Sequence, residues 1–132
     1  MASAARVLLD LEIGPLLVGL RTLEWRWDQL PAAGVDPGEM LAALADHASA
    51  TAKLACELTD RTGTARVADL GVLLFGVVAA LADGVVAESH RPLELARAVG
   101  LAADLHDAVE AVWRDRYRGA ASATSGSANA RP

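Results

Sequence analysis

Apolar residues recur at intervals of three and four along three separate stretches of the chain. In the first stretch, steps of 4,3,4,3,4,3 join Leu9, Ile13, Leu16, Leu20, Leu23, Trp27 and Leu30. The same alternation runs from Leu41 to Leu58 and from Leu95 to Val112. Such spacing lines one side of an α-helix and cannot line one side of a strand, whose side chains alternate between two faces. A fourth stretch, residues 65–88, is apolar almost all round, so we predict an all-α protein.

The predicted architecture is an antiparallel bundle of four helices, because connections of a few residues force neighbouring helices to run in opposite directions. We expect helices over residues 3–29, 37–62, 65–88 and 92–118, within a single domain covering residues 1–118. Gly14-Pro15 lies inside the first helix. Proline removes one backbone hydrogen bond and is expected to kink this helix. The alternative is two helices, with Pro15 opening the second.

Capping residues mark several of the predicted helix ends. Asp36 precedes Pro37 and can accept from free backbone amides, which predicts the start of the second helix. Gly63 is a plausible left-handed terminator, and Thr64 is expected to cap the next helix. Residues 119–132 are Ala, Ser, Thr, Gly and Asn with no apolar anchor, so we predict a disordered C-terminal tail.

Composition excludes some classes of function. A net charge of -5 argues against a general nucleic-acid binder, which presents basic stripes. The single cysteine cannot form an internal disulfide and suits a reducing cytoplasm. Asp10 and Glu12 interrupt any signal-peptide core, and Leu70–Ala82 is shorter than the roughly 20 residues of a membrane span. We expect a cytoplasmic protein that binds neither membranes nor nucleic acids, and the Ala- and Arg-rich composition is typical of a GC-rich bacterial genome.

Histidines are the main candidates for metal or acid–base chemistry. His106 and Glu110 are four residues apart, the spacing that two metal ligands on one helix need. Diiron bundles use Glu-x-x-His on two helices, and no such unit occurs in this sequence. We therefore expect no metal and no cofactor, with His106 at the edge of the core beside a hydrogen-bond partner.

His47 lies at the edge of the apolar side of the second predicted helix. In size and helix count the chain is similar to histidine phosphotransfer domains, which makes phosphotransfer a further alternative. The residues that follow, Ala48 to Lys53, lack the Lys and Gly pattern that usually comes after the phosphorylated histidine in that family.

Tryptophans gather near two predicted helix ends. Trp25 and Trp27 are two residues apart and point about 200° apart on a helix, and Trp25 continues a second apolar line through Leu8, Leu11 and Val18. Together with the apolar line from Leu9 to Leu30, this second line predicts that the first helix has a broad buried face. Core packing explains both these residues and Trp113. The alternative is a ligand pocket or partner surface formed by Trp25, Trp27, Trp113, His47, His106 and Glu110.

The stretch from residue 65 to 88 decides the functional expectation. No charged side chain occurs between Asp69 and Asp83, so we expect this helix to be fully buried, partly in a symmetric homodimer. The residues predicted at that interface are Val72, Phe75, Gly76, Ala79, Ala80 and Gly84. The resulting hypothesis is a homo-oligomeric protein-interaction module without catalytic chemistry. The alternatives are a small-molecule-binding bundle, including an enzyme of bacterial secondary metabolism, and a phosphotransfer or metal-binding bundle.

Overall fold

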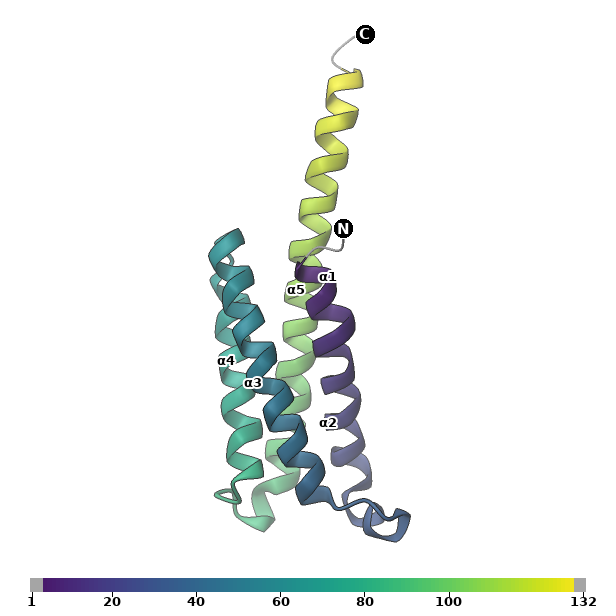
Figure 1. Cartoon of the computed structure of the whole chain (residues 1–132), viewed down its shortest axis with the longest axis vertical. Coiled ribbons are helices and arrows are strands. Elements are labelled where there is room, and N and C mark those ends of the chain that lie inside the picture. The colour runs from purple at the N-terminus through teal and green to yellow at the C-terminus, as the bar shows by residue number, and fades with distance from the viewer. Residues whose placement is uncertain (1–3, 130–132) are drawn as a thin grey trace.

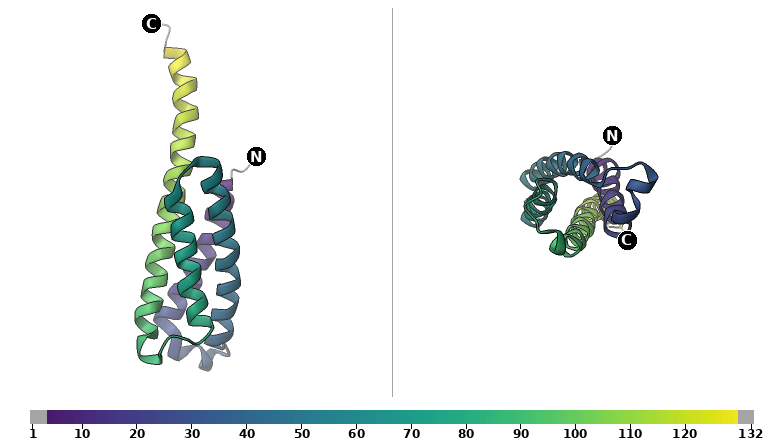
Figure 2. Two further views of the ribbon diagram at one scale, coloured as in Figure 1. Left: turned by 90° about the vertical axis from the view of Figure 1, so that its left-hand side faces the viewer. Right: turned by 90° about the horizontal axis from the view of Figure 1, so that it is seen from below.

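The computed structural model describes the backbone of residues 4–129 and the side chains of residues 5–115. Helices dominate this range and it contains no strand, so the prediction of an all-α protein is confirmed. The α-helices are α1 (Ala4–Val7), α2 (Gly14–Arg26), α3 (Pro37–Thr62), α4 (Ala65–Ala82) and α5 (Arg91–Asn129). The long helices lie beside one another along most of the molecule (Figures 1 and 2).

The first helical stretch changes its winding directly before Gly14-Pro15. A π-helical segment, η1 (Leu8–Ile13), connects α1 to α2, and the Gly14 amide donates to the Leu9 carbonyl, five residues back. Pro15 has no amide hydrogen, and its ring would crowd the carbonyl four residues earlier in a regular α-helix. The wider π-helical winding accommodates the proline without ending the helix.

Two of the predicted helix ends are confirmed. Asp36 caps α3, where its Oδ1 accepts from the Gly38 amide at 2.9 Å. Gly63 ends α3 with a left-handed backbone, φ 73°. The connection before α3 contains two 3₁₀ turns, η2 (Trp27–Gln29) and η3 (Pro31–Ala33), so the chain turns tightly after α2.

The predicted Thr64 cap is wrong. Thr64 occupies the N-cap position of α4, but its side chain makes no capping hydrogen bond. The Thr59 hydroxyl on α3 accepts instead from the Ala68 amide at 3.0 Å and donates to the Thr64 carbonyl at 2.9 Å. One hydroxyl therefore ties the end of α3 to the first turns of α4.

Helix α4 is shorter than predicted, ending at Ala82 instead of Glu88. Gly84 follows with φ 73°, a left-handed conformation that a side chain disfavours. A 3₁₀ turn, η4 (Glu88–His90), then leads into α5, with Pro92 in the first turn as predicted.

Helix α5 continues to Asn129, beyond the predicted end at Arg118. The side chains from residue 116 onward and the whole of residues 130–132 lie outside the described part of the chain. The disorder of residues 119–132 stays a prediction.

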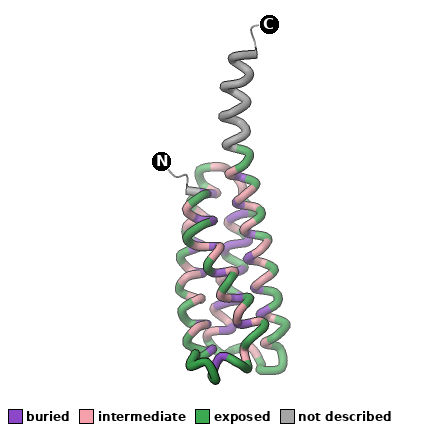
Figure 3. The backbone as a smooth tube through the Cα atoms, turned by 90° about the vertical axis from the view of Figure 1, so that its right-hand side faces the viewer, coloured by how far each residue is buried: buried purple, intermediate pink, exposed green. Residues whose placement is uncertain are grey.

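The core lies between the inward sides of the long helices (Figure 3). The residues at the predicted intervals are buried in α5 from Leu95 to Val112 and in the first stretch from Leu9 to Leu23. Trp27 is half-buried and packs at the edge of this core. The sequence spacing thus identified the core positions of three helices.

Candidate functional site

Helix α4 has an apolar side that the other described residues leave uncovered. Leu70, Leu74 and Val78 are buried, whereas Val72 is 54% exposed and Leu73 is 49% exposed. Within one chain, the prediction of a fully buried helix is therefore wrong. The physical reason is that α4 packs against α3 and α5, and these two neighbours leave its third side open to solvent.

The uncovered side of α4 forms one wall of a groove of about 310 Å³ against α5. Gly76 lies in the groove, and a Cβ atom placed on it would meet nothing within 4 Å. Leu93 on α5, one turn before Arg97, is 69% exposed and lies outside the residues that line the groove. We call this surface the α4–α5 face and define it by Val72, Leu73, Gly76, Ala80, Leu93, Glu94 and Arg97.

Two charged residues of opposite sign border the groove on α5. Arg97 Nη1 lies 3.6 Å from Glu94 Oε2, and the two side chains are 57% and 27% exposed. An exposed pair at this distance contributes little to stability, so both charges are available to other partners. The face therefore combines an apolar centre with a polar edge of mixed charge.

The predicted interface residues divide into three groups. Gly76 and Ala80 line the groove with Val72. Phe75 packs against the core, and Ala79 is half-buried. Gly84 lies in the turn after the helix. Sequence reasoning missed Leu73 and Leu93, because only the contacts of α4 with both neighbours determine which apolar side is left over.

Helix α4 is also long and apolar enough to cross a membrane, on length and composition alone. Its mean hydropathy is 1.9, and 39% of the helix is buried inside the protein. Core helices of water-soluble proteins meet the same criteria. Length and hydropathy therefore do not by themselves assign a function to the exposed apolar side of α4.

The first helical stretch carries a second set of outward apolar side chains. Leu11, Val18 and Trp25 are 63%, 67% and 75% exposed. The predicted broad buried face is therefore wrong at these three positions, and only Leu8 of that line is buried. They are seven residues apart, about 10 Å along a helix, on one outward side that also carries exposed Pro15 between Leu11 and Val18.

His47 connects α3 to the π-helical segment. Its Nε2 lies 2.7 Å from the backbone oxygen of Glu12 and 3.2 Å from the Glu12 carboxylate Oε2. Both partners are acceptors, so Nε2 carries the proton and donates. This nitrogen is occupied by a contact that holds two helices together, which disfavours the phosphotransfer alternative.

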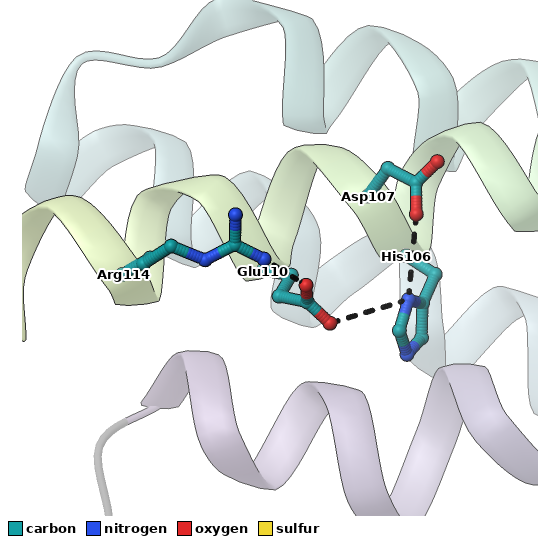
Figure 4. A network of polar contacts seen from close by, with 4 residues as sticks. All are labelled: His106, Asp107, Glu110 and Arg114. Atoms are coloured by element: carbon teal, nitrogen blue, oxygen red, sulfur yellow. Dashed lines mark hydrogen bonds and ion pairs between the residues drawn. The ribbon is translucent and has the colours of Figure 1, made fainter.

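His106 belongs to a polar cluster along one side of α5 (Figure 4). Its Nδ1 lies 3.8 Å from Asp107 Oδ1 and 4.0 Å from Glu110 Oε2, and Arg114 pairs with Glu110. Among the described residues, no group of three His, Cys, Asp or Glu side chains is arranged to hold a metal ion.

The three tryptophans do not share a pocket. The Arg91 guanidinium lies over Trp27, 4.1 Å from the ring centroid, and Arg6 lies over Trp113 at 5.3 Å. Arg91 and Trp113 are about 33 Å apart along α5 at 1.5 Å per residue. The predicted pocket of tryptophans, His47, His106 and Glu110 is therefore not assembled within the described residues; Trp25 points to solvent.

The α4–α5 face combines adjacent exposed apolar side chains with a groove between two helices. Comparison with protein-family models, curated proteins and solved structures found no match.

Proposed function

We propose that the protein is a cytoplasmic homodimeric interaction module that associates through the α4–α5 face. The observation that carries this proposal is the exposure of Val72 and Leu73 beside the open backbone of Gly76. Adjacent exposed apolar residues on one side of a helix are typical of an interface. Glycine at the centre permits the backbone of a second helix to approach closely.

The surface fits a symmetric partner. A twofold axis places the same residues of two copies opposite each other. Glu94 of one copy can then lie near Arg97 of the other, and the reverse pair forms at the same time. An apolar centre with complementary charges at its rim is the usual organisation of a protein interface.

The interface area that a stable dimer requires extends beyond α4. Stable interfaces bury about 800 Å² on each partner. Val72 and Leu73 supply only part of this area, so the proposed interface includes the groove and Leu93 on α5. Leu11, Val18 and Trp25 on the other side of the protein are left outside it.

The proposed arrangement within each chain is an antiparallel four-helix bundle, with the first helix bent where η1 meets Pro15. Short links after α3 and α4 and the packing of α4 against both α3 and α5 support it. Among the described residues, the ring of His47 contacts Glu12 and the ring of His106 contacts Asp107 and Glu110, and these contacts include no Ser, Thr or Cys side chain. The proposal therefore includes no catalytic reaction.

Substitution of Val72 by glutamate tests the proposal. We expect Val72→Glu to convert the dimer into a monomer, because two carboxylates would be buried at the twofold contact without partners. Sedimentation velocity across a range of protein concentrations measures the change, and circular dichroism checks that the helices are retained.

Val18→Glu is the matched control, since Val18 is also an exposed valine on a helix, with 67% exposure. The proposal requires that Val18→Glu stays dimeric. Dissociation by Val18→Glu with no effect of Val72→Glu would assign the interface to the first helix and contradict the proposal.

A further inference from the structure

A second hollow lies at the end of the molecule where α2 and α4 end and α3 and α5 begin. It has a volume of about 340 Å³ and is separate from the α4–α5 face. Its apolar wall consists of Trp27, Leu41, Leu81 and Val86, and its polar side contains Glu88 and Arg91. We call it the Arg91 pocket. Its volume is within the lower part of the range for small-molecule sites, about 300–1,000 Å³.

Arg91 brings a positive charge to this apolar wall. Its guanidinium stacks on Trp27 at 4.1 Å from the ring centroid, and the side chain is 22% exposed. Stacking covers the flat faces of a guanidinium and leaves its N–H edges free to donate. Trp27 thus fixes the orientation in which Arg91 meets a ligand.

The ion pair that Arg91 makes on the pocket side is loose. Among the described residues, the ion-pair partner of Arg91 is Glu88, with 3.7 Å between Nη1 and Oε1. That distance is longer than a hydrogen bond, and the Glu88 side chain is 88% exposed. A ligand anion can therefore replace Glu88 at the guanidinium edge at little cost.

We propose that the Arg91 pocket binds a small organic monocarboxylate with an apolar body. The carboxylate accepts hydrogen bonds from Arg91, and the apolar body lies against Leu81, Val86 and the Trp27 ring. One cation faces the pocket, and the chain carries a net charge of -5, so a single negative charge is favoured over a polyanion. The pocket has room for on the order of ten non-hydrogen atoms, judged from the ~30 Å³ that a water molecule occupies.

Two hollows adjoin the Arg91–Trp27 pair, and the ligand fits the one with the apolar wall. On the opposite side of the Arg91–Trp27 pair lies a smaller hollow of about 170 Å³, which Glu24 and Asp28 line. Their carboxylates repel an anion. The ligand is therefore placed toward α4.

Titration with decanoate, kept below its micelle-forming concentration, tests the proposal in the unmodified full chain. Decanol is the matched neutral probe with the same hydrocarbon body. We expect saturable decanoate binding by calorimetry at one site per chain, at least tenfold tighter than decanol, as a charge-assisted hydrogen bond provides. The indole N–H signal of Trp27 should shift in NMR spectra, while the amides of Val72 and Leu73 stay in place.

Variants identify the groups involved. Arg91→Met should weaken decanoate binding at least tenfold and leave decanol binding unchanged. Arg97→Met, which removes another arginine of α5 outside the pocket, should have no effect. Glu88→Gln should tighten decanoate binding severalfold, and this exposed side chain can be changed without affecting the fold.

Several results would overturn the proposal. These are equal affinities for decanoate and decanol, no heat of binding at millimolar decanoate, or shifts that map to Val72 and Leu73. Full decanoate affinity in a folded Arg91→Met protein would also contradict it. Because the pocket and the α4–α5 face share no residue, these outcomes are independent of the dimer.

Discussion

Gly71 on α4 lies so close to Ala55 on α3 that a Cβ atom at Gly71 would be 2.9 Å from the Ala55 Cβ. The same atom would be 3.4 Å from the Ala52 Cα. Both neighbours are backbone atoms or are attached to the backbone directly, so no flexible side chain can move aside. The separation of α3 and α4 therefore depends on glycine at this position.

We predict that Gly71→Ala lowers the free energy of unfolding by about 1 kcal/mol. Overpacking typically costs ~1–3 kcal/mol, and alanine returns up to ~1 kcal/mol through its higher helix propensity. Chemical denaturation measures the change. Gly100→Ala is the matched control, because a Cβ there would meet nothing within 4 Å, and it should stabilise the protein. Equal stabilisation by both substitutions would contradict the close α3–α4 contact.

The helices and most core positions could be predicted from the sequence because burial of one side imposes intervals of three and four. Asp36 and Gly63 were predictable as well, since capping is a local interaction. The outward direction of Val18 and Leu73 was not predictable. A helix with two apolar lines does not reveal which line its neighbours cover.

The Arg91–Trp27 contact likewise could not be predicted from the sequence. The two residues lie in different helical segments, and the turn after α4 brings Arg91 back to the end of α2. Gly84, which we assigned to an interface from its spacing, instead makes this turn with φ 73°.

Replacement of His47 tests its contact with the π-helical segment. We expect His47→Ala to lower the free energy of unfolding by about 1–2 kcal/mol, because the hydrogen bond to the Glu12 backbone oxygen is lost. Thermal and urea denaturation measure the effect. His90→Ala, at an exposed position in η4, should change stability by less than ~0.5 kcal/mol. If His47→Ala lowers the free energy of unfolding no more than His90→Ala does, the His47 contact does not stabilise the fold.

Metal content tests the interpretation of the His106 cluster. We expect the purified protein to carry no stoichiometric iron, zinc or copper, because among the described residues no group of three His, Cys, Asp or Glu side chains is arranged to hold a metal ion. Elemental analysis provides the measurement. About one metal ion per chain, lost in His106→Ala, would contradict this interpretation.

Removal of residues 119–132 tests the predicted tail. We expect an unchanged melting temperature, because this segment has no apolar anchor in its sequence. Differential scanning calorimetry of the shortened and full chains gives the comparison. A melting temperature lower by several degrees would show that the tail packs against the folded domain.

The mass of the unmodified protein in solution tests the central claim most directly. Light scattering at micromolar concentration should give twice the 13.7 kDa of one chain if, as we propose, a second copy covers the α4–α5 face. A mass of 13.7 kDa that persists as the protein concentration rises would contradict the account.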